Sequence, residues 1–190
     1  MTDAGDAEMA SDATMGGVET LGRPGARAAA DCLELARRDH LTIGFAESLT
    51  GGLITATFTA IPGASDVVVG GIVAYATRLK AELLDVDREL LDLVGAVDAE
   101  VASQMARGAA VRLGADIGVS CTGVAGPDPQ DGRSPGEVHV ALHRSGAAGA
   151  VRSFAFEGSR ADVRAATVSA AIDLLHDHLR GSGAGPARSR

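Results

Sequence analysis

Short apolar segments rich in β-branched residues alternate with segments of helical spacing, and this alternation limits the folds open to the chain. The candidate strands are residues 41–46, 66–76, 115–123, 137–143 and 151–157, and the candidate helices include 26–39, 53–60, 98–114 and 160–179. Such alternation is typical of an α/β fold. We predict a three-layer α/β/α sandwich with a mixed, largely parallel sheet, whose last two strands form a hairpin. Ligands of such sheets bind where loops leave the carboxyl ends of strands.

The two ends of the chain differ in composition from its middle. Residues 1–20 contain acidic but no basic side chains, and residues 181–190 consist of small residues, one proline and two arginines. Segments with so few large apolar side chains bury too little surface to offset the entropy lost on ordering. We therefore predict a disordered acidic tail over residues 1–23, a folded domain over 24–180 and a disordered tail over 181–190.

The charge balance and the cysteine usage exclude several classes of protein. A net charge of -8 argues against sequence-independent binding of nucleic acid. No apolar run reaches the roughly 18–20 residues of a membrane span, and the N-terminus lacks the pattern of a secretory signal. Cys32 and Cys121 have neither CxxC nor metal-site spacing, which is typical of free thiols in a reducing compartment. We expect a cytoplasmic protein that binds no metal, nucleic acid or membrane.

The first candidate loop runs from Glu47 through Ser48 and Thr50 to Gly51 and Gly52, between a predicted strand and a predicted helix. Free amides at a helix start can hold a phosphate, or they can stabilise an oxyanion formed when the serine attacks a carbonyl. Alternatively, the serine is only an N-cap and the glutamate is a surface or capping carboxylate. The residues alone leave these interpretations open.

The second candidate loop follows the strand 115–123. The Thr122 hydroxyl and the amides of this loop, including those of Gly123 and Gly126, can surround a phosphate or a ribose. The loop has neither the lysine of a P-loop nor the GxGxxG spacing of a dinucleotide site. Arg160 and Arg164, one helical turn apart, can clamp a phosphate, or they can be ordinary surface charges.

A nucleophilic serine needs a base, and none of the five histidines lies in a candidate loop. His139 and His143 share one face of a predicted strand, which favours a solvated face. Lys80 is the single lysine among 17 basic side chains. A buried lysine can become a base, whereas the pKa of arginine stays above about 12. Lys80 is therefore a candidate base, although a stray surface lysine is as good an account.

Tyr75 is the single tyrosine and precedes the single lysine by five positions. Its hydroxyl can hold or pass a proton beside Lys80. An ordinary, half-buried strand tyrosine is the alternative.

Five segments, in this order, resemble the C-terminal domain of the CinA family, the nicotinamide-nucleotide amidases. They are AESLTGG (46–52), IPGASDVVVGGIVAYATRLKAELLDV (61–86), GAVDAEVASQMARGAA (95–110), VSCTGVAGPD (119–128) and GSRADVRAAT (158–167). The resemblance implies that the domain 24–180 hydrolyses nicotinamide mononucleotide to nicotinic acid mononucleotide and ammonia, without a cofactor. This activity belongs to pyridine-nucleotide salvage in NAD metabolism. We expect the stand-alone form, because 190 residues leave no room for the molybdopterin-binding-like N-terminal domain of larger members.

The resemblance also implies roles for individual residues. The family's nucleophile corresponds to Ser48, and its activating pair corresponds to Tyr75 and Lys80. Its loop threonine corresponds to Thr122. Its arginine near the last helix corresponds to Arg160, with Arg164 as the second choice.

Three positions depart from the family pattern. Leu49 stands where the family usually has cysteine, and Val94 stands where it usually has histidine. The segment 134–138 is one residue shorter than the usual loop, which leaves the exact substrate open.

Two other functions compete with the amidase. A non-catalytic pyridine-nucleotide-binding or regulatory protein can use the same pocket, but the presence of all three catalytic residue types favours the enzyme. A Ser-Lys esterase or peptidase has no need of loops suited to phosphate. An apolar last helix and a Val-rich strand also suggest a homo-oligomer, although burial in the sheet explains them equally well.

Overall fold

A computed structural model of the chain describes residues 23–182. The first helix begins at Arg23 and the last ends at Ser182. The predicted tails therefore lie outside the described residues, except for Arg23 and for the two residues that extend the last helix beyond position 180.

The elements follow the predicted order along the chain. They are α1 (Arg23–Arg38), β1 (Ile43–Glu47), α2 (Leu53–Thr59), the 3-10 turn η1 (Ala64–Asp66), β2 (Val68–Val73), α3 (Thr77–Leu84), α4 (Arg88–Val94), α5 (Ala99–Leu113), β3 (Ile117–Gly123), β4 (Glu137–Arg144), β5 (Ala150–Ala155) and α6 (Arg160–Ser182). Asp98 caps α5 by accepting a hydrogen bond from the Glu100 amide, and Gly114 ends the helix in the left-handed conformation. Both ends of α5 were predicted.

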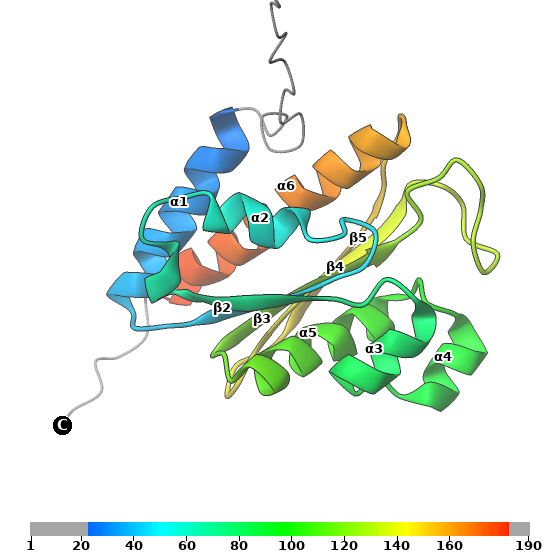
Figure 1. Ribbon diagram of the computed structural model, residues 1–190, viewed down its shortest axis with the longest axis horizontal. Helices are drawn as coiled ribbons and strands as arrows, with labels where there is room; N and C mark the ends of the chain where they lie inside the picture. The colour runs from blue at the N-terminus through cyan, green and yellow to red at the C-terminus, as the bar shows by residue number, and fades with distance from the viewer. Residues whose placement is uncertain (1–22, 183–190) are drawn as a thin grey trace, which may run out of the picture.

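The five strands form one sheet in the order β2-β1-β3-β4-β5. β1 pairs in parallel with β2 and with β3, whereas β4 is antiparallel to β3 and to β5. Helices α1, α2 and α6 cover one face of the sheet, and α3, α4 and α5 cover the other (Figure 1). The prediction of a three-layer α/β/α fold with a mixed sheet is confirmed. Within residues 23–182, no helix combines the length and the apolar character that crossing a membrane requires.

The central strands are buried because helices cover both of their faces. Every residue of β1 is buried, and so are the residues of β3 up to its last. This explains their continuous apolar sequences, which differ from the alternation of a strand with one face in water. The carboxyl ends of β1, β2 and β3 point to the same edge of the sheet, because these strands run in parallel. A ligand site is expected at this edge.

Close contact between α5 and α3 fixes the position of α3 at this edge. A Cβ atom on Gly108 of α5 would collide with the carbonyl group of Leu84, the last residue of α3. Only glycine therefore allows the two helices to approach so closely.

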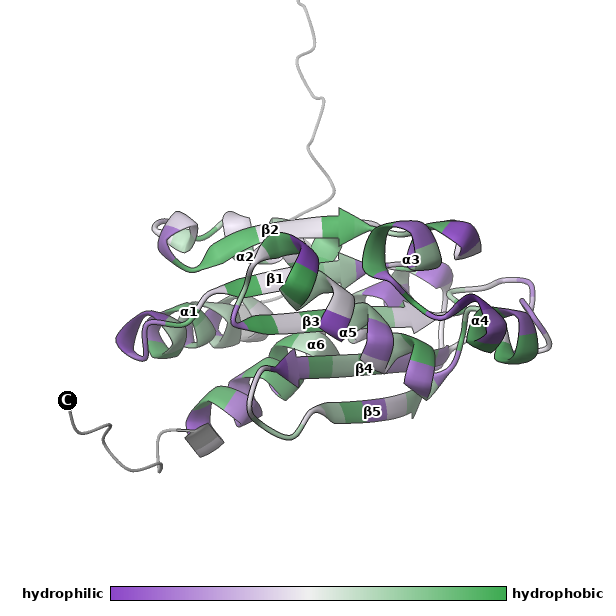
Figure 2. Cartoon of the chain, turned by 90° about the horizontal axis from the view of Figure 1, so that it is seen from below, coloured by the Kyte–Doolittle hydropathy of each residue, from purple (hydrophilic) through white to green (hydrophobic). Residues whose placement is uncertain are grey.

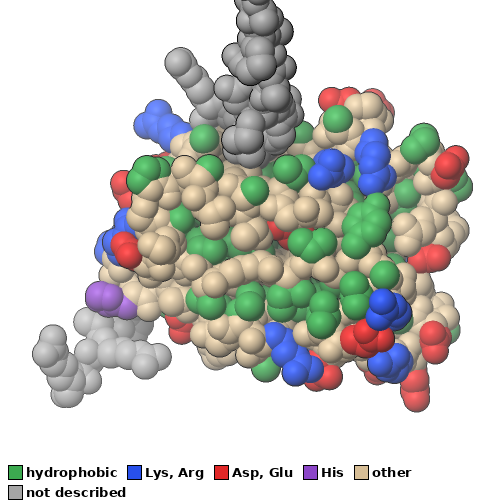
Figure 3. Space-filling model, viewed as in Figure 1, with side chains coloured by type: hydrophobic (Ala, Val, Ile, Leu, Met, Phe, Trp, Pro, Cys, Tyr) green, Lys and Arg blue, Asp and Glu red, His purple; other side chains and the backbone are tan. Residues whose placement is uncertain are grey.

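β2 is an edge strand with an apolar surface. Val69 is 47% exposed and Val73 is 43% exposed. Hydrophobic side chains gather along this strand on the face shown in Figure 3. Figure 2 shows β2 in white and green only, whereas α3 and α4 alternate between purple and green. An uncharged edge of this kind can pair with another chain. The homo-oligomer stays a prediction.

Candidate active site

A pocket of about 280 Å³ lies where β1, β2 and β3 end. Its walls come from four parts of the chain, namely residues 48–49, residues 75–77, the loop 123–130 and Arg160 at the start of α6. The fold therefore brings the two candidate loops together with the segment that contains the single tyrosine. This is the edge of the sheet at which the sequence predicted a site.

Ser48 and Lys80 are in direct contact at the base of this region. Lys80 Nζ lies 3.0 Å from Ser48 Oγ and donates a hydrogen bond of 2.9 Å to the carbonyl oxygen of Ala74. Lys80 is 1% exposed, and Ser48, which lines the pocket, is 7% exposed. Burial lowers the pKa of Lys80 from 10.5 to about 8 because the ammonium form loses its hydration. The neutral form of a lysine with this pKa becomes populated as the pH approaches 8, and this form can accept the proton of the serine.

The Glu47 carboxylate has a structural role that differs from the predicted one. It is fully buried, and it accepts hydrogen bonds from the amides of Gly52, Ile54 and Thr55 at the start of α2. It therefore neutralises the positive end of the helix and fixes the loop that contains Ser48. These amides therefore bond to Glu47 in the structure, and neither a phosphate or oxyanion at them nor a contact between Glu47 and a substrate finds support in this geometry. Its alternative interpretation as a capping carboxylate fits the structure.

Thr50, Gly51 and Gly52 form hydrogen bonds within the loop. The Thr50 hydroxyl donates to Glu47 and lies 3.1 Å from Cys121 Sγ, and the Gly51 amide donates to the Ser48 carbonyl oxygen. Thr50 is fully buried. None of the three lines the pocket, so their predicted contact with a substrate finds no support in the geometry.

Some residues of the second candidate loop bond to the rest of the protein, and others line the pocket. The Thr122 hydroxyl is buried and donates to the Ala96 carbonyl oxygen at 2.6 Å, so it is turned to the segment before α5 and not to the pocket. The predicted contact of this hydroxyl with a phosphate or a ribose therefore finds no support in the geometry. Gly123 and Gly126 do line the pocket, as the sequence suggested. Asp128, whose carboxylate is exposed, lines it as well and was not predicted.

The two arginines of α6 have different positions. Arg160 lines the pocket, and its guanidinium donates to the Gly126 carbonyl oxygen at 3.0 Å and to the Tyr75 hydroxyl at 2.9 Å. Arg164 donates to the carbonyl oxygens of Leu49 and Thr50 and thereby holds the serine loop from behind. Of the two, Arg160 is the one placed to meet a ligand.

Tyr75 lies at the mouth of the pocket. Its side chain is 59% exposed, so it is not the half-buried tyrosine of the alternative interpretation. Its hydroxyl accepts a hydrogen bond from Arg160. The side chain therefore joins the segment after β2 to the start of α6 across the pocket.

The histidine pair of β4 does not form the solvated face that its spacing suggested. His139 is buried, and its Nδ1 lies 2.8 Å from the Ser153 hydroxyl on the neighbouring strand. The two imidazoles lie away from the pocket lining. Within residues 23–182, no group of three or more His, Cys, Asp or Glu side chains is arranged to hold a metal ion.

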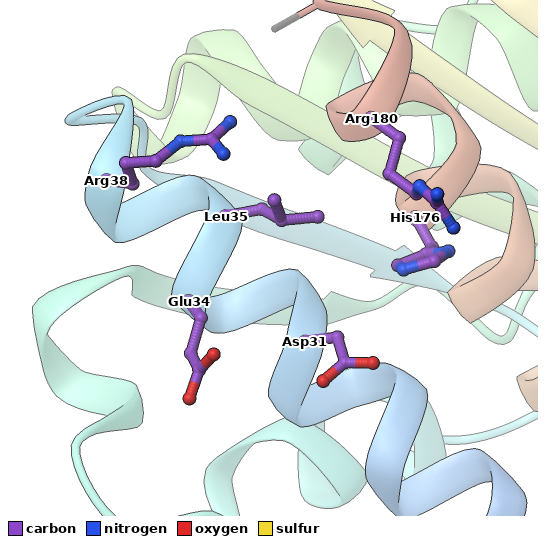
Figure 4. A pocket seen from close by; sticks show the side chains of 6 residues that line it. All are labelled: Asp31, Glu34, Leu35, Arg38, His176 and Arg180. Atoms are coloured by element: carbon purple, nitrogen blue, oxygen red, sulfur yellow. The ribbon is translucent and has the colours of Figure 1, made fainter.

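A larger hollow of about 450 Å³ lies between α1 and α6. Figure 4 shows acidic Asp31 and Glu34 with Arg38 on α1, opposite His176 and Arg180 on α6. None of the side chains around it carries a hydroxyl, a thiol or an amine. The contact between Ser48 and Lys80 makes the smaller pocket the candidate active site.

Comparison with known proteins identifies relatives over almost the whole described region. A sequence model of the CinA C-terminal domain matches residues 26–179. A CinA-like protein of Frankia casuarinae is 45% identical over 141 residues, which cover 74% of this chain and 32% of that protein. A CinA-like protein of Geotalea uraniireducens is 43% identical over 146 residues, which cover 76% of this chain and 34% of that protein. The chain thus spans about a third of the length of these relatives.

Solved structures show the same fold. A competence-damaged protein (CinA) superfamily protein from Klebsiella pneumoniae superposes with a TM-score of 0.79 at 26% identity, covering 83% of this chain and 98% of that one. A competence/damage inducible protein from Agrobacterium tumefaciens gives a TM-score of 0.71 at 37% identity, covering 79% of this chain and 96% of that one.

Proposed function

The chain belongs to the CinA C-terminal domain family, and on this premise we propose that it is an amidohydrolase that converts nicotinamide mononucleotide to nicotinic acid mononucleotide and ammonia. The observation that carries the proposal is the 3.0 Å contact between Ser48 and a buried Lys80 beside the pocket. An amide is hard to hydrolyse, and a serine paired with a neutral lysine supplies both a nucleophile and a base.

The reaction has two halves. In the first, Lys80 takes the proton of Ser48 while Oγ bonds to the carboxamide carbon. The tetrahedral intermediate then expels ammonia, which receives its proton from Lys80, and an ester to Ser48 remains. In the second half, Lys80 takes a proton from water, the water oxygen attacks the ester carbon, and the proton returns to Ser48 Oγ as the acid leaves. Lys80 therefore has the same protonation state at the end of each half as at its beginning.

The oxyanion of each intermediate needs hydrogen-bond donors. The amides at the start of α2 do not stabilise the oxyanion, because they already donate hydrogen bonds to Glu47. Leu49 follows the nucleophile directly and lines the pocket. We assign the oxyanion to the Leu49 amide, which has no hydrogen-bond partner among the described residues.

Arg160 is the proposed phosphate ligand. It is the arginine on the pocket wall, and the two groups that it bonds there, the Tyr75 hydroxyl and the Gly126 carbonyl, are both neutral. Its charge therefore remains available to an anion, and a guanidinium binds phosphate through two parallel hydrogen bonds. In this proposal Tyr75 acts by positioning Arg160 and not as the activating partner of Lys80 that the resemblance implied, so Tyr75→Phe should raise KM more than it lowers kcat.

The test is ammonia release from nicotinamide mononucleotide. We expect turnover by the wild type, loss of turnover in Ser48→Ala, and a decrease of about 10² or more in Lys80→Arg, because arginine cannot serve as a base. Arg78→Lys is the matched control, since this exposed residue lies on the same helix and pairs only with Glu82 among the described residues. Full activity in Lys80→Arg would show that another group is the base.

Ammonia release measured together with nucleotide binding separates the amidase from the alternative. Tight binding of the nucleotide by the wild type without ammonia release would favour a non-catalytic or regulatory protein. A cytoplasmic role in pyridine-nucleotide salvage is part of the amidase proposal.

A further inference from the structure

The pocket presents two opposite charges that do not neutralise each other. Arg160 and Asp128 both line it, one from α6 and the other from the loop after β3. In the part of the chain that the structure describes, Arg160 donates only to neutral oxygens and forms no ion pair with Asp128. The carboxylate and the guanidinium are therefore both open to a ligand.

The loop that bears Asp128 is fastened on both sides of this residue. Before it, the Gly126 carbonyl accepts a hydrogen bond from Arg160. After it, Asp131 accepts a hydrogen bond of 3.2 Å from the Ala96 amide. Further along, Arg133 pairs with Glu137 at 3.1 Å and with Asp98 at 3.6 Å. The chain on either side of Asp128 is thus held in place, which keeps this residue in the lining of the pocket.

A pocket with separate negative and positive groups suits a ligand that carries both charges. We infer that Asp128 recognises the positive charge of an oxidised pyridinium ring, and that the pocket thereby selects oxidised over reduced pyridine mononucleotides. This inference rests on the proposed function, in which Arg160 binds the phosphate and the ring carboxamide reaches Ser48. The reduced dihydropyridine keeps the ribose, the phosphate and the carboxamide but has no charge on the ring. Asp128 attracts only the oxidised form.

The size of the preference follows from the attraction between a carboxylate of the pocket lining and a charged ring. An opposite charge a few ångströms away in a partly hydrated site changes affinity by on the order of tenfold. A carboxylate that instead bonded the ribose hydroxyls would favour both forms equally. The ratio of the two affinities therefore separates recognition of charge from recognition of the sugar.

The experiment is calorimetric titration of Ser48→Ala, in which no turnover disturbs binding, with nicotinamide mononucleotide and with its reduced form. We expect the reduced form to bind about tenfold more weakly, and Asp128→Asn in the same background to bring the ratio of dissociation constants below about twofold. Asp92→Asn is the control for net charge, because this exposed residue of α4 lies away from the pocket. It should keep the full ratio.

Each outcome bears on one claim. Equal affinities in the Ser48→Ala protein, an unchanged ratio in Asp128→Asn, or no binding of either nucleotide would overturn the inference about Asp128. Ammonia release is measured separately on the protein with Ser48 intact. A preference for the oxidised form without ammonia release would refute the amidase and support charge recognition by Asp128. Ammonia release without such a preference would support the amidase and refute charge recognition.

Discussion

Replacing Lys80 with methionine removes a buried amine while keeping a long, unbranched side chain. The pKa of this amine falls from 10.5 to about 8 because burial disfavours the ammonium form. At about 1.36 kcal/mol per pKa unit, the charged form costs the folded state about 3 kcal/mol. This cost is the quantity that Lys80→Met removes.

The sign of the pH dependence follows from proton binding. Below about pH 8 the amine is protonated in both the folded and the unfolded chain, so the full cost is present. Between about pH 8 and 10.5 the folded chain has released the proton and the unfolded chain still holds it, so the wild type becomes more stable as pH rises. The free energy of unfolding of Lys80→Met minus that of the wild type should therefore fall by about 2 kcal/mol from about pH 7 to pH 9.5.

The Lys80→Met variant also lacks two contacts of Lys80 Nζ, the hydrogen bond to the Ala74 carbonyl oxygen and the contact with Ser48 Oγ. Each is worth about 1 kcal/mol, and this loss does not depend on pH. The test is therefore the slope of the difference with pH, measured by urea unfolding followed by circular dichroism. Arg78→Met, on the exposed side of α3, should show no slope. A difference for Lys80→Met that stays constant within about 0.5 kcal/mol would refute the lowered pKa and the base role built on it.

Three further outcomes are expected. The value of kcat/KM for nicotinamide mononucleotide should rise with pH and level off above an apparent pKa of about 8, because only neutral Lys80 accepts a proton; a flat profile would exclude this base. Glu47→Gln should lower the free energy of unfolding by about 2–4 kcal/mol in urea titrations, since an amide cannot accept all the hydrogen bonds of the carboxylate; exposed Glu34→Gln should not. Cys32 and Cys121 should resist a thiol reagent in the native protein and react after unfolding, because both are buried and burial raises the pKa of the Cys121 thiol to about 11.

The layers of the fold were predictable because periodicity and capping are local. The short apolar sequences of β1 and β3 indicated strands, and both strands are buried in the sheet. Asp98 and Gly114 marked the ends of α5 through their own backbone preferences. These signals need no knowledge of distant residues.

The directions of the site side chains were not predictable in the same way. Glu47 and Thr122 stand in the two candidate loops, yet both turn into the protein, because buried amides and a buried carbonyl required partners. The bond between Tyr75 and Arg160 joins residues 85 positions apart and depends on the packing of α6 against the sheet. The role of Lys80 was suggested by composition and by the resemblance to the family, whereas its burial became visible only in the fold.

The pocket combines parts that differ in how readily they open. The hydrogen bond between Tyr75 and Arg160 crosses its mouth in contact with solvent, whereas Ser48 and Lys80 lie within the packed interior. Exposed hydrogen bonds break and re-form far more often than buried ones. The mouth can thus open to a ligand through local fluctuations, while Ser48 and Lys80 keep their separation. Access to the pocket and the geometry of the Ser48–Lys80 pair therefore depend on different contacts.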